Sequence, residues 1–169
     1  SVKEIAEEVE ELDTDDAVDL IAKLPEARQA EVIAQIEDEE RVQDIQELLT
    51  YDEDSAGGLM AKELVKVNEN WTVTKCMREM RTQASEVKRV HSIYVVDDEN
   101  KLIGRLSLKD LLTANDKAKV KSVYIPKVDY VNISEQGEEV AKLMAKYDLE
   151  AVPVVDDEKK LLGRITIDD

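Results

Sequence analysis

Residues 91–110 read HSIYVVDDENKLIGRLSLKD, and residues 150–169 read EAVPVVDDEKKLLGRITIDD. At a constant offset of 59 residues, ten of the twenty aligned positions are identical. Each copy holds two apolar runs joined by a polar Asp-Asp-Glu segment, which predicts two strands and a turn. A supersecondary unit written twice favours two modules that pack on each other, because one copy alone cannot bury its apolar face.

The same order of predicted elements leads into both copies. Apolar patterns predict a strand and then a helix before each copy, at residues 63–67 and 71–80 and at residues 128–133 and 134 onward, with Ser134 as a helix cap. Each copy is therefore predicted as β-α-β-β-α. The acidic runs at 97–99 and 156–158 lie where two strands must reverse. Because Asp is favoured in turns, we interpret both runs as turns and not as metal sites.

The first fifty residues follow a helical pattern instead. Apolar residues recur at i, i+3, i+4 and i+7 in Ala17, Leu20, Ile21 and Leu24, and a second series with a spacing of twelve comprises Leu12, Leu24, Ile36 and Leu48. Short helices with short links predict a stacked superhelical array of the armadillo type. Asp38 is placed to cap the last helix.

The predicted fold is α+β in two parts. Residues 1–56 form the acidic all-α array, residues 57–118 the first repeated module and residues 119–169 the second. We expect the array to be truncated at its start and the second module at its end, since the first copy continues after its second strand into Leu111 and Leu112.

Composition excludes several classes of function. The chain has 40 acidic and 23 basic residues and a net charge of −17, which would repel the phosphate backbone of a nucleic acid. A single cysteine, Cys76, excludes an internal disulfide, and with one histidine, His91, the chain lacks the soft ligands of a zinc site. No apolar run approaches the roughly 20 residues of a membrane span. No catalytic triad, phosphate-binding glycine loop or acid–base pair stands out, so we predict that the chain is not an enzyme.

A short motif closes each repeat. It reads Gly104-Arg-Leu-Ser107-Leu-Lys-Asp110 in the first copy and Gly163-Arg-Ile-Thr166-Ile-Asp-Asp169 in the second. This Gly-x-x-Ser/Thr-x-x-Asp pattern, together with the order of elements, resembles the cystathionine-β-synthase (CBS) domain family.

The CBS resemblance implies a tandem pair with ligand clefts between its two copies, and ATP or another adenosine nucleotide as a candidate ligand. In this reading Ser107 and Thr166 lie near phosphate, and Asp110 and Asp169 accept from ribose hydroxyls. The family often stacks adenine on an aromatic ring, for which Tyr130 is the candidate, with Tyr124 as an alternative.

A second resemblance covers nearly the whole chain. An acidic helical array, then YDEDSAGGLM at residues 51–60, then two CBS copies is similar to the cytosolic part of MgtE-type magnesium channels. LMAKYD at 143–148, with the Val-Pro-Val-Val strand that follows it, adds to the likeness. The resemblance implies a homodimer through the CBS domains, a transmembrane pore domain in the same polypeptide, and a place on the cytoplasmic face of the cell membrane.

The same resemblance implies magnesium bound between the N-terminal array and the CBS pair. The candidate ligands are Asp15, Asp16 and Asp19 on one side, and Asp168 or Asp169 with the Gly58 carbonyl on the other. Asp15 and Asp19 are four residues apart, so their carboxylates share one helix face, and magnesium prefers such hard oxygen ligands. Capping and compensation of the helix dipole also explain Asp15 and Asp16. Helix capping or ribose recognition also explains Asp169.

A second magnesium site is implied near the dimer interface. Its candidate ligands are Glu138, the Ala145 carbonyl and Asp148. Glu138 and Asp148 are ten residues apart, close to a whole number of helical turns. The alternative for Glu138 is a solvated helix start.

Three functions remain open at this point. In the first, like charges hold the acidic array and the CBS pair apart until magnesium draws them together and closes a pore. In the second, the CBS clefts bind an adenosine nucleotide and regulate through it. In the third, the acidic array is a scaffold for a partner protein.

Overall fold

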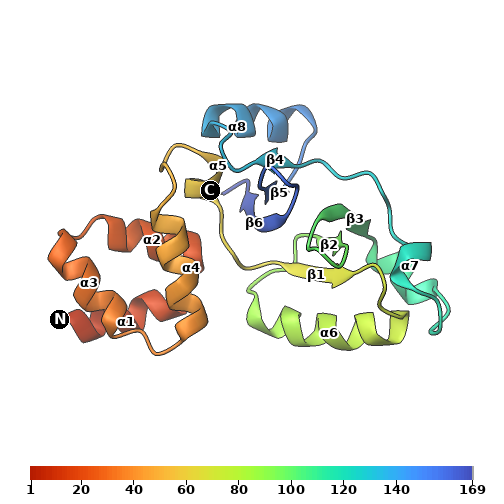
Figure 1. The fold of residues 1–169 in the computed structure, drawn as a ribbon, viewed down its shortest axis with the longest axis horizontal. Coiled ribbons are helices and arrows are strands. Elements are labelled where there is room, and N and C mark those ends of the chain that lie inside the picture. Colours follow the sequence, from red (N-terminus) through yellow and green to blue (C-terminus); the bar gives the residue numbers. More distant parts are fainter. Residues whose placement is uncertain (169) are drawn as a thin grey trace.

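The computed structural model describes residues 1–168, and Figure 1 shows two regions: a cluster of helices in red and orange, and two sheet modules beside it. The helical cluster, called the N domain here, consists of α1 (Val2–Glu11), α2 (Thr14–Ala22), α3 (Glu26–Ala34) and α4 (Glu39–Leu49). Asp38 caps α4 as predicted, because its carboxylate accepts from the amides of Glu40 and Arg41.

The spacing of twelve marks the core of the N domain. Ile36 and Leu48 are buried in its apolar cluster, and Leu12 and Leu24 pack against them. Arg41 connects the first and last helices, since Nη2 donates to the carbonyls of Val9 (2.7 Å) and Leu12 at the end of α1. The Leu12 amide also donates to the Val9 carbonyl at 3.3 Å, and the cation adds a charged donor at the C-terminal end of α1.

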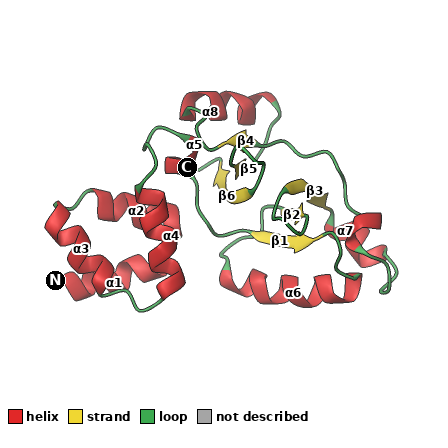
Figure 2. Ribbon diagram, viewed as in Figure 1, coloured by secondary structure: helices red, strands yellow, loops and turns green. Residues whose placement is uncertain are grey.

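The remainder holds two three-stranded sheets, drawn in yellow in Figure 2. The first contains β1 (Val65–Asn68), β2 (Ile93–Val96) and β3 (Leu102–Leu106), and the second contains β4 (Val131–Asn132), β5 (Ala151–Val155) and β6 (Leu161–Thr166). Each sheet pairs its first two strands in parallel and its last two antiparallel. The helices are α6 (Val73–Glu86), α7 (Leu108–Thr113) and α8 (Gly137–Lys146), with a 3₁₀ turn at Val120–Ser122. This arrangement confirms the predicted α+β fold.

The repeat extends to the irregular features of the two hairpins. In the β2–β3 hairpin the pairing register shifts between Val95 and Val96. In the β5–β6 hairpin it shifts between Val154 and Val155, which are the equivalent positions 59 residues later. In the turns, Asp97 Oδ1 accepts from two following amides at 2.9 Å, and Asp156 Oδ1 does the same. Both acidic runs are therefore turns built on an Asp side chain.

The segment that leads into each repeat pairs with the last strand of the other repeat. Ala61, on the way into the first repeat, exchanges backbone hydrogen bonds of 2.8 and 2.9 Å with Arg164 of β6. Ile125, on the way into the second, does the same with Arg105 of β3. A Cβ atom on Gly104 would lie 2.3 Å from the Ile125 carbonyl oxygen, and one on Gly163 would lie 2.5 Å from that of Ala61. The repeated glycine thus makes room for the crossing segment.

Several predicted boundaries were wrong. The first strand begins at Val65 rather than residue 63, and the strand predicted at 128–133 shrinks to two residues. The helix predicted at 71–80 runs from Val73 to Glu86. Ser134 does not cap α8, because Gln136 is the N-cap residue and the Ser134 hydroxyl bonds the side chain of Asn132.

The segment at 51–60 joins the N domain to the second repeat. It forms α5 (Ala56–Leu59), and the amides of Ala56 and Gly57 donate to carbonyls in the turn before α8 at 2.8 and 2.9 Å. One apolar cluster therefore runs from the N domain through Ala56 and Met60 into the second repeat, while the first repeat has a separate cluster around Cys76.

Candidate functional site

The N-terminal end of α2 docks against the CBS pair through Thr14. Its amide and hydroxyl both donate to Glu63 Oε1, at 2.7 and 2.9 Å, and its hydroxyl accepts from the Lys62 amide at 2.8 Å. Thr14 is 1% exposed, so these bonds are shielded from water. Glu63, which was predicted to begin the first strand, instead binds the N domain through Thr14.

Two ion pairs cross the same interface. Arg164 Nη2 lies 3.4 Å from Asp13 Oδ2, and Lys62 Nζ lies 3.0 Å from Glu47 Oε2. Asp13 is the N-cap residue of α2 but makes no capping hydrogen bond, because its carboxylate is turned to Arg164. The interface therefore includes attraction between opposite charges as well as the opposed carboxylates that the sequence suggested.

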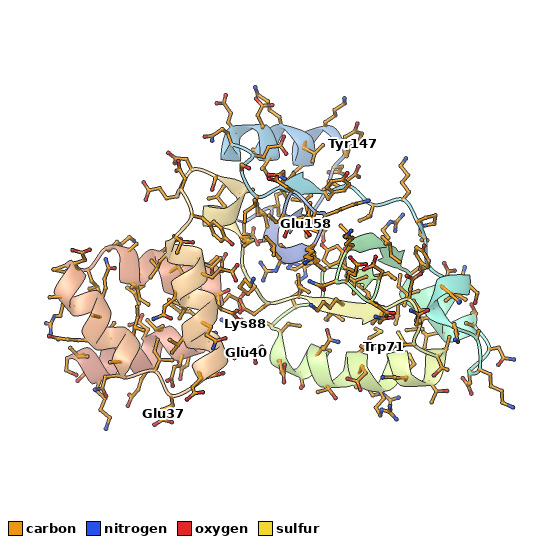
Figure 3. The ribbon with its side chains drawn as sticks, viewed as in Figure 1. Glu37, Glu40, Trp71, Lys88, Tyr147 and Glu158 are labelled. Carbon is orange, nitrogen blue, oxygen red and sulfur yellow. The ribbon has the colours of Figure 1, made fainter. Side chains whose placement is uncertain are left out.

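Carboxylates still outnumber cations beside these pairs. A polar cleft of about 430 Å³ separates α4 from the end of α6, and its charged lining is Asp38, Glu40, Arg41, Asp44, Lys62, Glu63 and Glu86. Burial raises the pKa of Asp44, Lys62 lowers it, and the nearby carboxylates of Glu40, Glu47 and Glu63 raise it further. Glu40, labelled in Figure 3, lies on the side of the N domain that faces α6.

The predicted magnesium ligands of the N domain lie on α2, directly after the docked Thr14. Asp15 is 8% exposed, whereas Asp16 and Asp19 are exposed. Asp168 follows β6 and is exposed, and Asp169 lies outside the described residues. Within residues 1–168, no group of three or more Asp, Glu, His or Cys side chains is arranged to hold a metal ion. Magnesium keeps several waters and often takes only one or two carboxylates from a protein, and Asp15, Asp16 and Asp19 are the carboxylates predicted for that role on this side of the interface.

Gly58 has a packing role as well. It lies in α5, and a Cβ atom there would lie 2.1 Å from the Asp52 carbonyl oxygen. The loop at 52–54 therefore requires glycine at this position, whether or not the Gly58 carbonyl binds an ion.

The second predicted magnesium set does not come together within one chain. Glu138 lies in the first turn of α8 and is 3.9 Å from Lys142 Nζ, while Ala145 and Asp148 lie at the other end. Glu138 is about 12 Å along the axis from Lys146, the last residue of α8, at about 1.5 Å per residue, and Asp148 lies beyond that end. Ala145 and Asp148 do meet, because the Asp148 amide donates to the Ala145 carbonyl at 3.4 Å, and both residues line a groove of about 200 Å³ beside Thr166.

An open cleft lies between the two repeats. Its volume is about 380 Å³, and it is lined by Ser92, Tyr94, Arg105, Lys127, Val128, Asp129, Tyr147, Leu149, Ala151 and Pro153. Arg105 and Lys127 give it positive charge, and Arg105 Nε donates to the Lys127 carbonyl at 3.2 Å. The Tyr94 hydroxyl is buried, and burial raises its pKa to about 12, against the smaller opposing effects of the Ser92 side chain and Arg164. Such a cavity, with a few convergent polar groups, is of the size that binds small molecules.

The prediction of the nucleotide residues was wrong for this open cleft, because none of Ser107, Asp110, Tyr130 and Thr166 lines it. Ser107 caps α7 by accepting from the Asp110 amide at 3.4 Å, and Asp110 is exposed. Tyr130 is 45% exposed, and Lys159 Nζ lies 5.0 Å from its ring centre. Thr166 is buried at the end of β6, and the ribose candidate Asp169 is outside the described residues.

Sequence reasoning missed four residues of the open cleft: Tyr94, Arg105, Lys127 and Tyr147. Arg105 was visible in the repeated Gly-Arg pair, and Tyr147, labelled in Figure 3 at the end of α8, belongs to the segment at 143–148. Lys127 had no signal in the sequence.

Comparison with known proteins follows this division of the chain. The CBS domain family matches residues 56–117 and 120–169, and the MgtE intracellular N domain family matches residues 1–54. The magnesium transporter MgtE of Thermus thermophilus is 44% identical over 126 residues, which cover 75% of this chain and 28% of that protein. That of Enterococcus faecalis is 37% identical over 130 residues, covering 77% and 29%. The chain thus spans less than a third of these relatives.

Two solved structures are similar over nearly the whole chain. The soluble part of a magnesium transporter has 34% identity and a TM-score of 0.90, covering 99% of this chain and 65% of that one. The cytosolic domain of the Mg²⁺ channel MgtE in complex with ATP has 39% identity and a TM-score of 0.87, covering 97% and 67%. In residues 1–168, no helix is long and apolar enough to cross a bilayer. The chain belongs to the MgtE family of magnesium transporters, and it comprises an intracellular N domain and a pair of CBS domains.

Proposed function

We propose that this chain senses magnesium and gates a transport pore from the cytoplasmic face of the membrane. The observation that carries the proposal is the distribution of charge. Residues 1–54 hold 20 acidic and 4 basic side chains, whereas residues 55–169 hold 20 acidic and 19 basic. Nearly all of the net charge therefore belongs to the N domain, with −16 against −1 for the rest.

This charge makes docking of the N domain depend on cations. Two like charges about 5 Å apart repel by roughly 1–3 kcal/mol at effective dielectric constants between 80 and 20. The pairs Asp13–Arg164 and Glu47–Lys62 hold the docked position, while the excess negative charge of the N domain and the crowded carboxylates around Asp44 oppose it. A dication bound between these carboxylates replaces their repulsion with attraction. It shifts the equilibrium by the difference between its affinities for the docked and undocked states.

Docking would then act on the pore through the dimer. Two chains meet through their CBS domains, and a compact dimer pulls on the pore domains of the same polypeptides and closes the pore. High magnesium inside the cell would thereby stop further uptake. The named relatives, which are magnesium transporters, support this reading.

Small-angle scattering in chelator and in millimolar magnesium tests the proposal. We expect a smaller radius of gyration in magnesium, and loss of that change in the triple variant Asp15→Asn, Asp16→Asn, Asp19→Asn. The matched control Glu7→Gln, Glu8→Gln, Glu11→Gln removes the same charge from exposed positions on α1 and should compact normally. The proposal fails if wild type scatters identically in both solutions, or if the control loses the response as fully as the α2 variant.

A nucleotide function has its own supporting observation, the open cleft with Arg105, Lys127 and the buried Tyr94 hydroxyl. We propose that ATP binds there with its phosphates toward the two cations, as a second regulatory ligand. Calorimetry should show that Arg105→Ala and Lys127→Ala each weaken ATP about tenfold. Arg78→Ala, an exposed arginine on α6, should leave the affinity unchanged. Equal affinity in all four proteins would exclude the cleft as the site.

A further inference from the structure

One region of this acidic chain is strongly basic, and it belongs to the first repeat. Residues 101–127 hold seven basic and two acidic side chains, whereas residues 55–100 hold seven of each sign and residues 128–169 hold five basic and eleven acidic. Figure 1 shows α7 and the loop after it at the opposite end of the long axis from the N domain. The molecule therefore has an acidic end and a basic end.

The segment after α7 presents three of these basic side chains to solvent. The amides of Val120 and Lys121 donate at 2.9 and 2.8 Å to carbonyls in the loop before α6, at residues 71 and 69. Val120 is buried in the core of the first repeat, and Ala118 packs against that core. With these two apolar side chains turned inward, the side chains that flank them remain exposed, namely Lys117, Lys119 and Lys121.

The single tryptophan of the chain lies against this segment. The Trp71 carbonyl accepts the Val120 amide, and the Trp71 side chain is half-buried at the margin of the first repeat's core. Lys75 is exposed, and its Nζ lies 5.1 Å from the centre of the Trp71 ring. Figure 3 shows Trp71 at the end of α6 that is nearer α7. The term basic edge is used here for Trp71, Lys75, Lys117, Lys119 and Lys121.

The charge of the basic edge is available to an external anion. Lysines elsewhere lie near carboxylates, as Lys62 does with Glu47 at 3.0 Å and Lys142 with Glu139 at 3.3 Å. Within residues 1–168, no carboxylate lies within 4 Å of the ammonium group of a lysine of the basic edge. These lysines therefore remain cations that no part of the described chain neutralises.

Lysines around a half-buried tryptophan suit the surface of an anionic bilayer. Each lysine near such a surface is attracted to the acidic headgroups, and tryptophan rings favour the depth of the headgroups. At physiological ionic strength the electrostatic field of exposed charges decays over about 8 Å, so the local charge of the basic edge decides and not the net charge of the chain. The distant acidic N domain therefore does not prevent this contact.

We propose that the basic edge binds the anionic lipid surface of the cytoplasmic leaflet, with the N domain directed away from it. The contact holds the first repeat at the membrane while the N domain docks and undocks. This inference rests on the proposed place of the chain at the cytoplasmic face, but it does not require magnesium. Its test is made in chelator, so its failure would leave the magnesium-dependent scattering result untouched.

Trp71 reports the contact directly, because no other residue contributes tryptophan fluorescence. The tag-free chain is titrated at physiological salt with vesicles of phosphatidylcholine alone, or of phosphatidylcholine and phosphatidylglycerol in equal amounts. In both cases the acyl chains carry bromine, which quenches a nearby indole. We expect quenching by the mixed vesicles, none by phosphatidylcholine alone, and loss of the quenching in molar salt.

A triple variant and a matched control locate the binding surface. In Lys117→Gln, Lys119→Gln, Lys121→Gln the lipid concentration for half-maximal quenching should rise about a hundredfold, at about fivefold for each lysine. The control removes the same charge from exposed positions of the N domain and should match wild type. It is Lys3→Gln, Lys23→Gln, Arg28→Gln.

The remaining outcomes would overturn the proposal. It is wrong if the two kinds of vesicle quench Trp71 equally, if neither quenches it, or if the N-domain control weakens binding as much as the triple variant of the basic edge. It is also wrong if Trp71 ignores vesicles but its emission changes with protein concentration in their absence. The basic edge would then bind the acidic N domain of a second copy.

Discussion

Arg105 and Arg164 occupy the same position in two nearly identical hairpins, yet their surroundings differ. Both donate through Nε to the segment that enters the other repeat. Arg105 is exposed beside an open cleft, whereas Arg164 is 8% exposed and paired with Asp13. The N domain therefore makes a symmetric pair of repeats asymmetric, and the same residue acquires a different role in each. Substitutions at matched positions separate what the repeats share from what the N domain adds.

The largest expected effect concerns a feature that both repeats share. Gly104→Ala and Gly163→Ala each place a methyl group within 2.6 Å of a backbone carbonyl, so a crossing segment must move. We expect each substitution to lower the free energy of unfolding by about 3 kcal/mol or more, measured by urea denaturation.

Gly137→Ala is the matched control for the two glycine substitutions. A Cβ atom there would lie 2.8 Å from the flexible tip of Leu59 and 3.2 Å from the Asp54 carbonyl oxygen, well outside the distances at Gly104 and Gly163, so its cost should stay below about 1 kcal/mol. If all three variants unfold at the same urea concentration, the crossing segments do not require glycine.

The next effect separates the two repeats. Arg164→Ala leaves Asp13 without its ion pair in a largely buried position, and we expect a loss of about 2–3 kcal/mol. Arg105→Ala removes an exposed side chain and should cost about 0–1 kcal/mol. Urea denaturation of both variants measures the difference. Equal losses would mean that the N domain adds no stability through Arg164.

The repeats themselves were predictable because their chemistry is local. An Asp that accepts from amides two and four residues ahead forms its turn without help from the rest of the chain, as Asp97 and Asp156 do. The twelve-residue apolar spacing in the N domain is local in the same sense. Its helices bury the residues that their periodicity marked.

The surroundings of the two arginines were not predictable, because their difference comes from distant residues. The Gly-Arg pair is the same in both copies. Arg164 differs from Arg105 because it pairs with Asp13, which lies 151 residues away in the sequence. Glu138 and Asp148 show a related limit. Their spacing of ten residues fits one helix face, but α8 ends at Lys146 and Asp148 has a φ of 52°, so the two residues do not share the helix.

A smaller effect tests the helix that begins each repeat. Thr72 caps α6, and its hydroxyl accepts from the Lys75 amide at 3.2 Å. Gln136 holds the matching position before α8 and makes no capping bond through its side chain. Thr72→Ala should cost about 1 kcal/mol and Gln136→Ala almost nothing, as measured by urea denaturation. A loss in Gln136→Ala as large as that in Thr72→Ala would show that the side-chain bond is not the source of the stability.

The smallest expected effect is a pH dependence that only the first repeat carries, since Glu150 is the counterpart of His91. Burial, followed by Arg164 and Arg89, lowers the pKa of His91 in the folded chain below its value of about 6.5 in the unfolded chain. Between these two pKa values the unfolded chain binds more protons, so stability rises with pH in that window. The stability associated with a neutral His91 is fully present above pH 6.5 and is lost as the pH drops below that value. Urea denaturation at pH 7.5 and 5.5 should therefore show a smaller pH-dependent loss in His91→Gln than in wild type. Identical losses of stability in the two proteins would show that groups other than His91 account for the acid sensitivity of the fold.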